Sequence, residues 1–246
     1  MTRVNPVAAA GFASAAEVYD RARPSYPPKA IDWLVERTGL GPGKTVVDVG
    51  AGTGKLTRQL VGTGARVVAV EPIAEMRALI GVGEAVDGTA EELPLEDASA
   101  DALTVAQAFH WFDSDRALPE LHRVLRPGGR LALFWNVRDL DDPLQRAVEA
   151  LLSEHRGQLV PQREGRWRLP LAESRLFGDE ERREFRLEQR FTADDLCARV
   201  ASTSFVAAMP PGEREGLLGR VRELVGGREE PFSFPYRTEV PLFPRI

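Results

Sequence analysis

The chain has 246 residues, of which 43% are hydrophobic and 28% are charged, and its formal net charge at neutral pH is -5. This composition is typical of a folded globular protein and argues against intrinsic disorder. The negative charge gives the whole chain no electrostatic attraction to nucleic acid or to an anionic membrane. No apolar run approaches the roughly 18 residues of a membrane span. Since Met1–Ala16 also lacks the leucine-rich stretch of a secretory signal, we expect a cytoplasmic protein.

Cysteine and histidine are scarce. Cys197 is the single cysteine, and the three histidines are His110, His122 and His155. One cysteine excludes an intrachain disulfide, and this inventory excludes the usual zinc sites built from cysteine and histidine. We therefore expect no metal site.

The first forty residues are expected to cap the fold and not to build its core. Phe12–Tyr26 is amphipathic and aromatic. Pro27-Pro28 can open a helix that ends before Gly39 and repeats apolar residues at helical spacing, namely Ile31, Leu34 and Val35.

From residue 45 onward, strand and helix patterns alternate, which predicts a parallel sheet. The predicted strands are Thr45–Val49, Arg66–Val70, Glu84–Asp87, Ala102–Ala106 and Arg130–Trp135. Three helices are predicted between these strands. The first carries the apolar residues Leu56, Leu60 and Val61, the second spans Ile73–Ile80, and the third carries Leu118, Leu121 and Val124. The last of these ends at Arg126-Pro127-Gly128-Gly129, a strong stop signal.

The second half has a less regular pattern. We expect a helix from Pro143 to about Glu154, an irregular arginine-rich stretch to Gly178, and a strand over Glu184–Phe191. Thr192 with Asp195 predicts a capped helix. One more helix, carrying Leu217, Leu218, Val221 and Leu224, precedes a last strand over Tyr236–Leu242. No internal repeat or low-complexity linker divides the chain, so a single domain is expected.

A glycine-rich turn, Gly50-Ala51-Gly52-Thr53-Gly54, follows the first strand and precedes a helix, where backbone can approach a ligand closely. A dinucleotide site needs Gly-x-Gly-x-x-Gly, and here the last glycine comes one residue early. A phosphate-binding loop fails too, since Gly39–Lys44 has one residue too few and precedes its strand. The pattern that fits is acid-x-Gly-x-Gly-x-Gly. Its acid, Asp48, would repel a pyrophosphate and suits a cationic cofactor.

These residues resemble the first motif of class I S-adenosylmethionine-dependent methyltransferases, and further segments match in order. Glu71 ends the second strand at the position from which a carboxylate accepts two hydrogen bonds from a ribose diol. Gly88–Pro94 resembles the adenine segment, Asp101–Ala106 the fourth strand, and Leu125–Gly129 the turn before the fifth. The detailed resemblance covers residues 12–136.

The resemblance implies an α/β fold, doubly wound and Rossmann-like. Its seven-stranded sheet would be mostly parallel with a reversed final strand, and an N-terminal helical lid would cover the cofactor. Within the single domain, residues 1–40 would form the helical cap, 41–136 the cofactor-binding half and 137–246 the substrate-side half.

The cofactor implied is S-adenosyl-L-methionine, with S-adenosyl-L-homocysteine as product. Gly50 and Gly52 would pass its methionine end, Asp48 would favour its ammonium directly or through water, and Glu71 would hold its ribose. Ile73 would flank the adenine. Thr89 departs from the Asp or Asn that the family often has, which leaves the adenine amine to Glu91 or to water. The full predicted set is Tyr19, Arg23, Asp48, Gly50, Ala51, Gly52, Gly54, Glu71, Pro72, Ile73, Thr89, Ala90, Glu91 and Gln107. The alternative for Asp48 and Glu71 is that they merely cap strand ends.

The N-terminal aromatic segment and Ala108–Phe112 resemble the small-molecule branch of the family, which includes trans-aconitate-type and ubiquinone-pathway-type enzymes. His110 is the candidate catalytic base, or else it only shapes the pocket. The candidate substrate contacts are Tyr26, Phe109, Trp111 and Trp135, with core packing as the alternative. Tyr19, Arg23 and Tyr26 form either a lid or a simple docking helix.

The predicted function is methyl transfer to a small-molecule acceptor. Arg23 and the arginines of the second half favour an acceptor with a carboxylate. A protein that only senses S-adenosylmethionine or its product is one alternative. Methylation of RNA or protein is another, weakly supported because Arg156–Arg190 holds nine arginines but also seven acidic residues. No nucleic-acid or membrane partner is expected, and the oligomeric state is left open.

Overall fold

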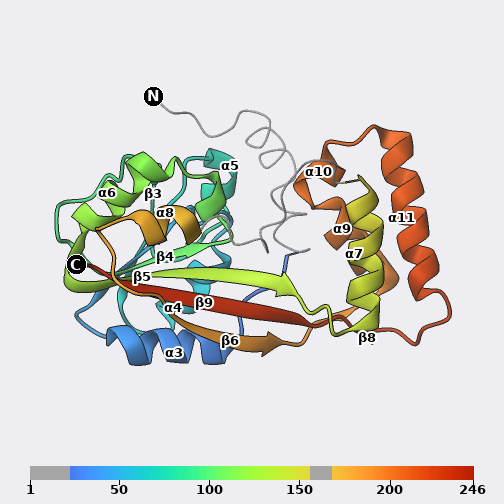
Figure 1. The fold of residues 1–246 in the computed structure, drawn as a ribbon, viewed down its shortest axis with the longest axis horizontal. Helices are drawn as coiled ribbons and strands as arrows, with labels where there is room; N and C mark the ends of the chain where they lie inside the picture. Colours follow the sequence, from blue (N-terminus) through green and yellow to red (C-terminus); the bar gives the residue numbers. More distant parts are fainter. Residues whose placement is uncertain (1–22, 156–167) are drawn as a thin grey trace.

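A seven-stranded sheet forms the centre of the computed structural model, which describes residues 23–155 and 168–246 (Figure 1). The strand order is β3-β2-β1-β4-β5-β9-β6. In that order the strands are Glu84–Val86, Arg66–Val70, Thr45–Val49, Ala100–Ala106, Leu125–Arg138, Tyr236–Pro244 and Glu181–Leu187. The first five run parallel, and β9 is antiparallel to both β5 and β6. The predicted sheet with its reversed final strand is confirmed.

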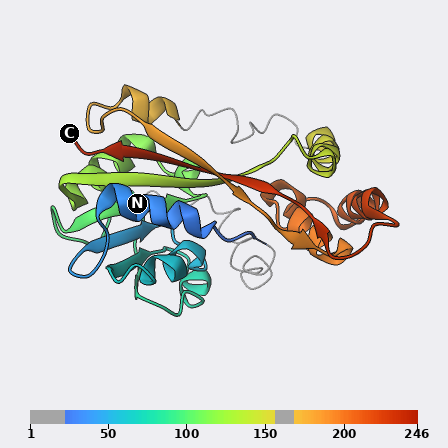
Figure 2. The same cartoon turned by 90° about the horizontal axis from the view of Figure 1, so that it is seen from below.

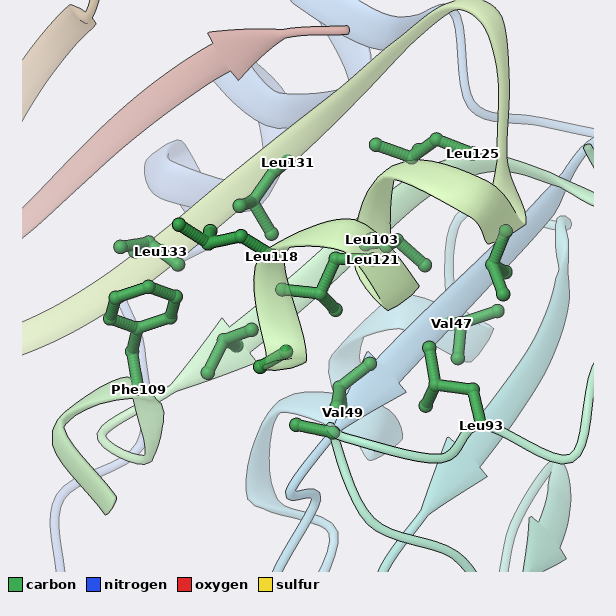
Figure 3. Close-up of a cluster of buried hydrophobic side chains, with 14 of the residues drawn as sticks. Val47, Val49, Leu93, Leu103, Phe109, Leu118, Leu121, Leu125, Leu131 and Leu133 are labelled. Atoms are coloured by element: carbon green, nitrogen blue, oxygen red, sulfur yellow. The ribbon is translucent and has the colours of Figure 1, made fainter. Parts of the chain in front are cut away.

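Successive strand residues point to opposite faces of the sheet, and each face packs against helices. On one face, Val47, Leu103 and Leu131 belong to a buried cluster with α6 (Ser114–Val124) and α8 (Arg168–Glu173). Figure 3 shows Leu118 and Leu121 of α6 lying over these strands. On the other face, Val46 and Phe134 join a second cluster with α3 (Pro28–Thr38) and α4 (Lys55–Val61).

The expectation that the first forty residues stay out of the core is wrong for α3. Ala30 and Leu34 are fully buried, and Trp33 is nearly so. The apolar spacing that predicted the helix serves to cover one face of the sheet, because that face would otherwise expose its valines to water. The part of the predicted lid before Arg23 lies outside the described residues.

A group of helices lies beyond the carboxyl end of β5, as Figures 1 and 2 both show. These are α7 (Pro143–His155), α9 (Ala193–Ala201), α10 (Ser204–Ala207) and α11 (Pro211–Val225). They share a third hydrophobic cluster, which contains Val148, Leu196, Val200 and Val221. We call this group the helical lobe. Among the described residues, no helix is long and apolar enough to cross a membrane.

Several element bounds differ from the predictions. The helix expected over Ile73–Ile80 is the shorter α5 (Ala74–Arg77). The stretch expected to be irregular contains α8, and β5 begins at Leu125, ahead of the Pro-Gly-Gly turn. The strand expected over Glu184–Phe191 is split in two. Its second part, β7 (Arg190–Phe191), pairs instead with β8 (Phe232–Ser233).

The capping box at the start of α9 is confirmed. The Thr192 hydroxyl accepts a hydrogen bond from the backbone amide of Asp195. In return, the Asp195 carboxylate accepts one from the backbone amide of Thr192. We predict that Thr192→Ala lowers the free energy of unfolding by about 1 kcal/mol, because the first helical turn loses an acceptor. Urea titration would measure the loss. Thr192→Ser keeps the hydroxyl and should stay near wild type; an equal loss in both variants would contradict the capping role.

Candidate active site

A cavity of about 430 Å³ opens at the carboxyl ends of the parallel strands, where ligands bind in open α/β sheets. Its volume is in the range of small-molecule sites. The predicted cofactor residues that line it are Arg23, Gly50, Ala51, Gly52, Glu71, Pro72, Ile73, Thr89, Ala90, Glu91 and Gln107. Two of the predicted substrate residues, Tyr26 and Trp111, line it as well.

The glycine loop is fixed by the neighbouring strand. The backbone amides of Gly50 and Ala51 both donate to the carbonyl of Val70, over 2.9 and 3.1 Å. Gly50 has a φ of 67°, and a Cβ atom there would lie 2.9 Å from the Cβ of Ala108. At Gly52 a Cβ would meet no atom within 4 Å. The loop is therefore packed tightly at Gly50, whereas the space beside Gly52 is open.

Glu71 sits at the end of β2 with its carboxylate turned to the loop. One oxygen accepts from the backbone amide of Gly52 over 2.8 Å, and the other accepts from that of Ile73 over 2.9 Å. The residue is only 4% exposed, and burial raises the pKa of Glu71. An ionised carboxylate offers about four acceptor positions, so two backbone donors leave room for two hydroxyl groups of a ligand.

Asp48 lies beneath the loop and does not line the cavity. It is completely buried, and its two oxygens accept from the hydroxyls of Thr57 and Thr104 over 2.6 and 2.9 Å. Burial raises the pKa of Asp48 to about 6, and the charge of Glu71 adds a smaller effect in the same direction. This position favours the alternative in which Asp48 holds the strand end. Gly54, also outside the cavity lining, begins α4 with a φ of 82°.

The end of β4 contributes a backbone conformation that is rare for residues other than glycine. Gln107 has a φ of 56°, and its amide donates to the carbonyl of Phe134 over 2.9 Å. Its side chain donates to the backbone carbonyl of Asn136 over 3.3 Å. Such strain persists where surrounding structure enforces it, often at ligand sites. Gln107 thus reaches the cavity wall between the ends of β4 and β5.

His110 is in the short helix η1 (Phe109–Trp111) and does not line the cavity. Its ring lies 4.5 Å from that of Trp111 and 5.6 Å from that of Trp135, between centroids. The residue as a whole is exposed, and partial desolvation of its imidazole, together with the charge of Arg23, lowers the pKa of His110. Phe109 and Trp135, predicted to wall the substrate pocket, are 1% and 2% exposed core residues outside the cavity lining.

The segment that leads into α3 lines the cavity with Arg23, Pro24 and Tyr26. Arg23 donates to the backbone carbonyl of Ser202 at the end of α9 over 2.7 Å. Tyr26 is packed edge-on against Phe134, with ring centroids 5.4 Å apart. The structure therefore brings Arg23 and Tyr26 to the predicted site, whereas Tyr19 lies outside the described residues.

Sequence reasoning missed several residues that line the cavity. They include Lys55, Leu56, Met76, Phe112, Asp113 and Arg199. Lys55 and Phe112 each directly follow a predicted site residue, which is the signal that could have found these two. Arg199 is different, because it comes from the helical lobe, far along the chain from the glycine loop, and no motif surrounds it.

Comparisons with known proteins agree with this geometry. A family model described as a methyltransferase domain matches residues 47–133. An uncharacterized methyltransferase of Mycobacterium tuberculosis is 45% identical over 87% of this chain and 85% of its own length. The chain belongs to the class I S-adenosylmethionine-dependent methyltransferases. The family resemblance predicted from the sequence is confirmed.

Further relatives extend the match across the chain. A solved structure from Anaeromyxobacter dehalogenans, described as a type II methyltransferase, superimposes on this chain with a TM-score of 0.64. The two sequences are 26% identical, and the match covers 90% of this chain and 96% of that one. A ubiquinone/menaquinone biosynthesis C-methyltransferase of Hahella chejuensis is 33% identical over 73% of this chain and 78% of its own length. Membership of the family implies S-adenosylmethionine as the cofactor.

Gly50 offers a direct test of the loop in this methyltransferase. We predict that Gly50→Ala weakens S-adenosylmethionine binding at least tenfold, because the added methyl group collides with Ala108 and strains a left-handed backbone. Calorimetric titration would measure the affinity. Gly212→Ala in α11, where a Cβ meets no atom within 4 Å, is the matched control. Unchanged affinity in the Gly50 variant would contradict the loop's assignment.

Asp48 predicts a pH dependence of stability. Its folded-state pKa of about 6 exceeds the roughly 3.9 of an unfolded aspartate, so the folded state binds more protons between these values. The stability of the wild type therefore falls as pH rises from 4 to above 6, by at most about 3 kcal/mol from this group. Asp48→Asn should lose less stability over that range. Urea titrations at several pH values would show it; parallel pH profiles for the two proteins would contradict the assignment.

Proposed function

We propose that this methyltransferase acts on a small-molecule acceptor that carries a carboxylate. The observation that supports it best is a cavity of about 430 Å³ that joins the glycine loop and Glu71 to a second region around Tyr26 and Trp111. A cavity of this size suits a cofactor with a compact acceptor. The Hahella relative is named for ubiquinone and menaquinone biosynthesis, which also supports a small organic acceptor.

The residues present fit the cofactor. Glu71 keeps acceptor positions for a ribose diol, and the open side of Gly52 lets backbone approach the methionine end. Ile73 and Met76 supply an apolar wall for the adenine, next to Thr89 and Glu91. When bound, S-adenosylmethionine supplies an electrophilic methyl group on a positively charged sulfur.

The chain contributes chiefly by position. Methyl transfer needs a nucleophile in line with the bond that breaks, and holding both reactants in one water-poor cavity favours that geometry. Tyr26 and Trp111 bound the acceptor side, and Arg23 adds positive charge there, which suits a carboxylate. The negative net charge of the chain supports an acceptor other than nucleic acid. The proposed location is the cytoplasm.

The test is a paired binding and turnover experiment. S-adenosylmethionine affinity would be measured by calorimetry, and S-adenosylhomocysteine formation would be followed with a panel of small carboxylic acids, phenols and amines. We expect tight binding that is lost in Glu71→Ala, with turnover of at least one acid. Glu75→Ala, an exposed residue on α5, is the matched control. Binding of S-adenosylmethionine without product from any compound would favour a protein that only senses the cofactor. Turnover only with RNA or protein would show that the acceptor is a macromolecule and contradict the proposal.

His110 allows a separate prediction. A general base typically contributes 10²–10⁴-fold to the rate, whereas a histidine that packs against tryptophans shapes the pocket. Because the imidazole does not line the cavity and its pKa is lowered, we predict that His110→Gln reduces kcat by less than about tenfold. Steady-state kinetics with the acceptor found above would measure it. A loss of more than a hundredfold, with cofactor affinity unchanged, would establish His110 as the base instead.

A further inference from the structure

Arg199 has a buried guanidinium that no acidic side chain neutralises among residues 23–155 and 168–246. The residue is 7% exposed and lies on α9. Its Nε donates to the hydroxyl of Tyr236 over 3.1 Å, and the guanidinium carbon lies 5.8 Å from the centre of that ring. Its Nη1 is buried and has no hydrogen-bond partner within the described part of the chain.

A buried guanidinium without an anionic partner destabilises the folded state unless a ligand neutralises it. Buried polar groups are almost always hydrogen-bonded, and a buried charge without a partner is strongly unfavourable. Arg199 lines the same cavity as the glycine loop. A guanidinium presents several N–H groups in a planar fork that matches a carboxylate. An anionic oxygen that enters the cavity would therefore supply the charge that this guanidinium lacks among the described residues.

The position of Arg199 in the fold indicates which ligand supplies that oxygen. Its partner Tyr236 is on β9, four strands along the sheet from β2, which carries Glu71 at its end. Four spacings of about 4.8 Å separate the two strands by about 19 Å. Arg199 thus stands at the end of the cavity away from the proposed ribose site. Arg23 is on the same side, since it contacts Ser202 one turn further along the lobe.

We propose that Arg199, held in place by Tyr236, binds the carboxylate of the methyl acceptor and selects for acidic acceptors. This inference rests on the proposed function and names the residue that determines its specificity. The carboxylate of the cofactor's methionine has the same chemistry and is the other possible source of the anion, which the experiment must separate.

The experiment uses simple probes because no acceptor is needed to detect the site. Acetate, succinate and benzoate would be titrated calorimetrically into the full chain saturated with S-adenosylhomocysteine, each beside its uncharged primary amide. We expect at least one acid to bind at least tenfold more tightly than its amide. Arg199→Gln should abolish this preference while S-adenosylhomocysteine affinity changes less than twofold. Arg222→Gln, an exposed arginine on α11 paired with Asp194, should keep it.

Two further variants separate a binding role from a structural one. Arg199→Lys keeps the positive charge without the planar fork, so a weakened but measurable preference for the acid is expected. Tyr236→Phe keeps the buried ring and removes only the hydroxyl that orients Arg199. It should weaken acid binding by a smaller factor. Thermal unfolding of each variant would show that the chain is folded at the titration temperature.

Three results would overturn the inference. In the first, no acid is preferred to its amide by the wild type. In the second, Arg199→Gln keeps the full preference. In the third, Arg199→Gln loses S-adenosylhomocysteine affinity tenfold, which would assign the residue to the cofactor's carboxylate. Failure of the proposed function is distinguishable, because then the wild type either does not bind S-adenosylhomocysteine or binds it and yields no product with any small molecule.

Discussion

The buried carboxylate of Asp48 joins three elements beneath the glycine loop. It lies one residue before the end of β1, and it accepts hydrogen bonds from Thr57 of α4 and Thr104 of β4. These contacts fix the direction in which the chain leaves β1, and the amides of Gly50 and Ala51 then complete the turn on the carbonyl of Val70. Burying a carboxyl group here without these hydrogen bonds would destabilise the folded state. The loop after β1 is therefore held by Asp48 from below and by the carbonyl of Val70 from the neighbouring strand.

The cavity has two regions built by different means. Short loops at the ends of β1 and β2 form the proposed cofactor region, where backbone amides and Glu71 meet. The opposite region is completed by residues distant in sequence, since Arg23 precedes α3 and Arg199 comes from the helical lobe. The helices of the lobe pack around a hydrophobic cluster of their own, which also includes Tyr236 of β9. The opposite region therefore depends on packing that the glycine loop does not share.

The sequence predicted local structure well where one strand or helix decides it. β1 and β2 have the predicted bounds because β-branched runs flanked by glycine turns leave few alternatives. Side-chain direction was harder, since Phe109 and Trp135 could point to cavity or core, and burial places both in the core. Spacing alone predicts Asp48 at the cofactor, because it does not show that two threonines from other elements hydrogen-bond to its carboxylate. No sequence signal marks Arg199, because only tertiary packing brings α9 to the cavity.

The central claim is that one cavity holds the cofactor at the glycine loop and the acceptor beside the helical lobe. A crystal structure with S-adenosylhomocysteine and a bound carboxylic acid would test it most directly. The account predicts both ribose hydroxyls within hydrogen-bonding distance of Glu71, the backbone of the Gly50–Gly52 turn beside the homocysteine end, and the acid's oxygens on Arg199. A cofactor bound with its ribose away from Glu71, or an acid bound outside this cavity, would contradict it.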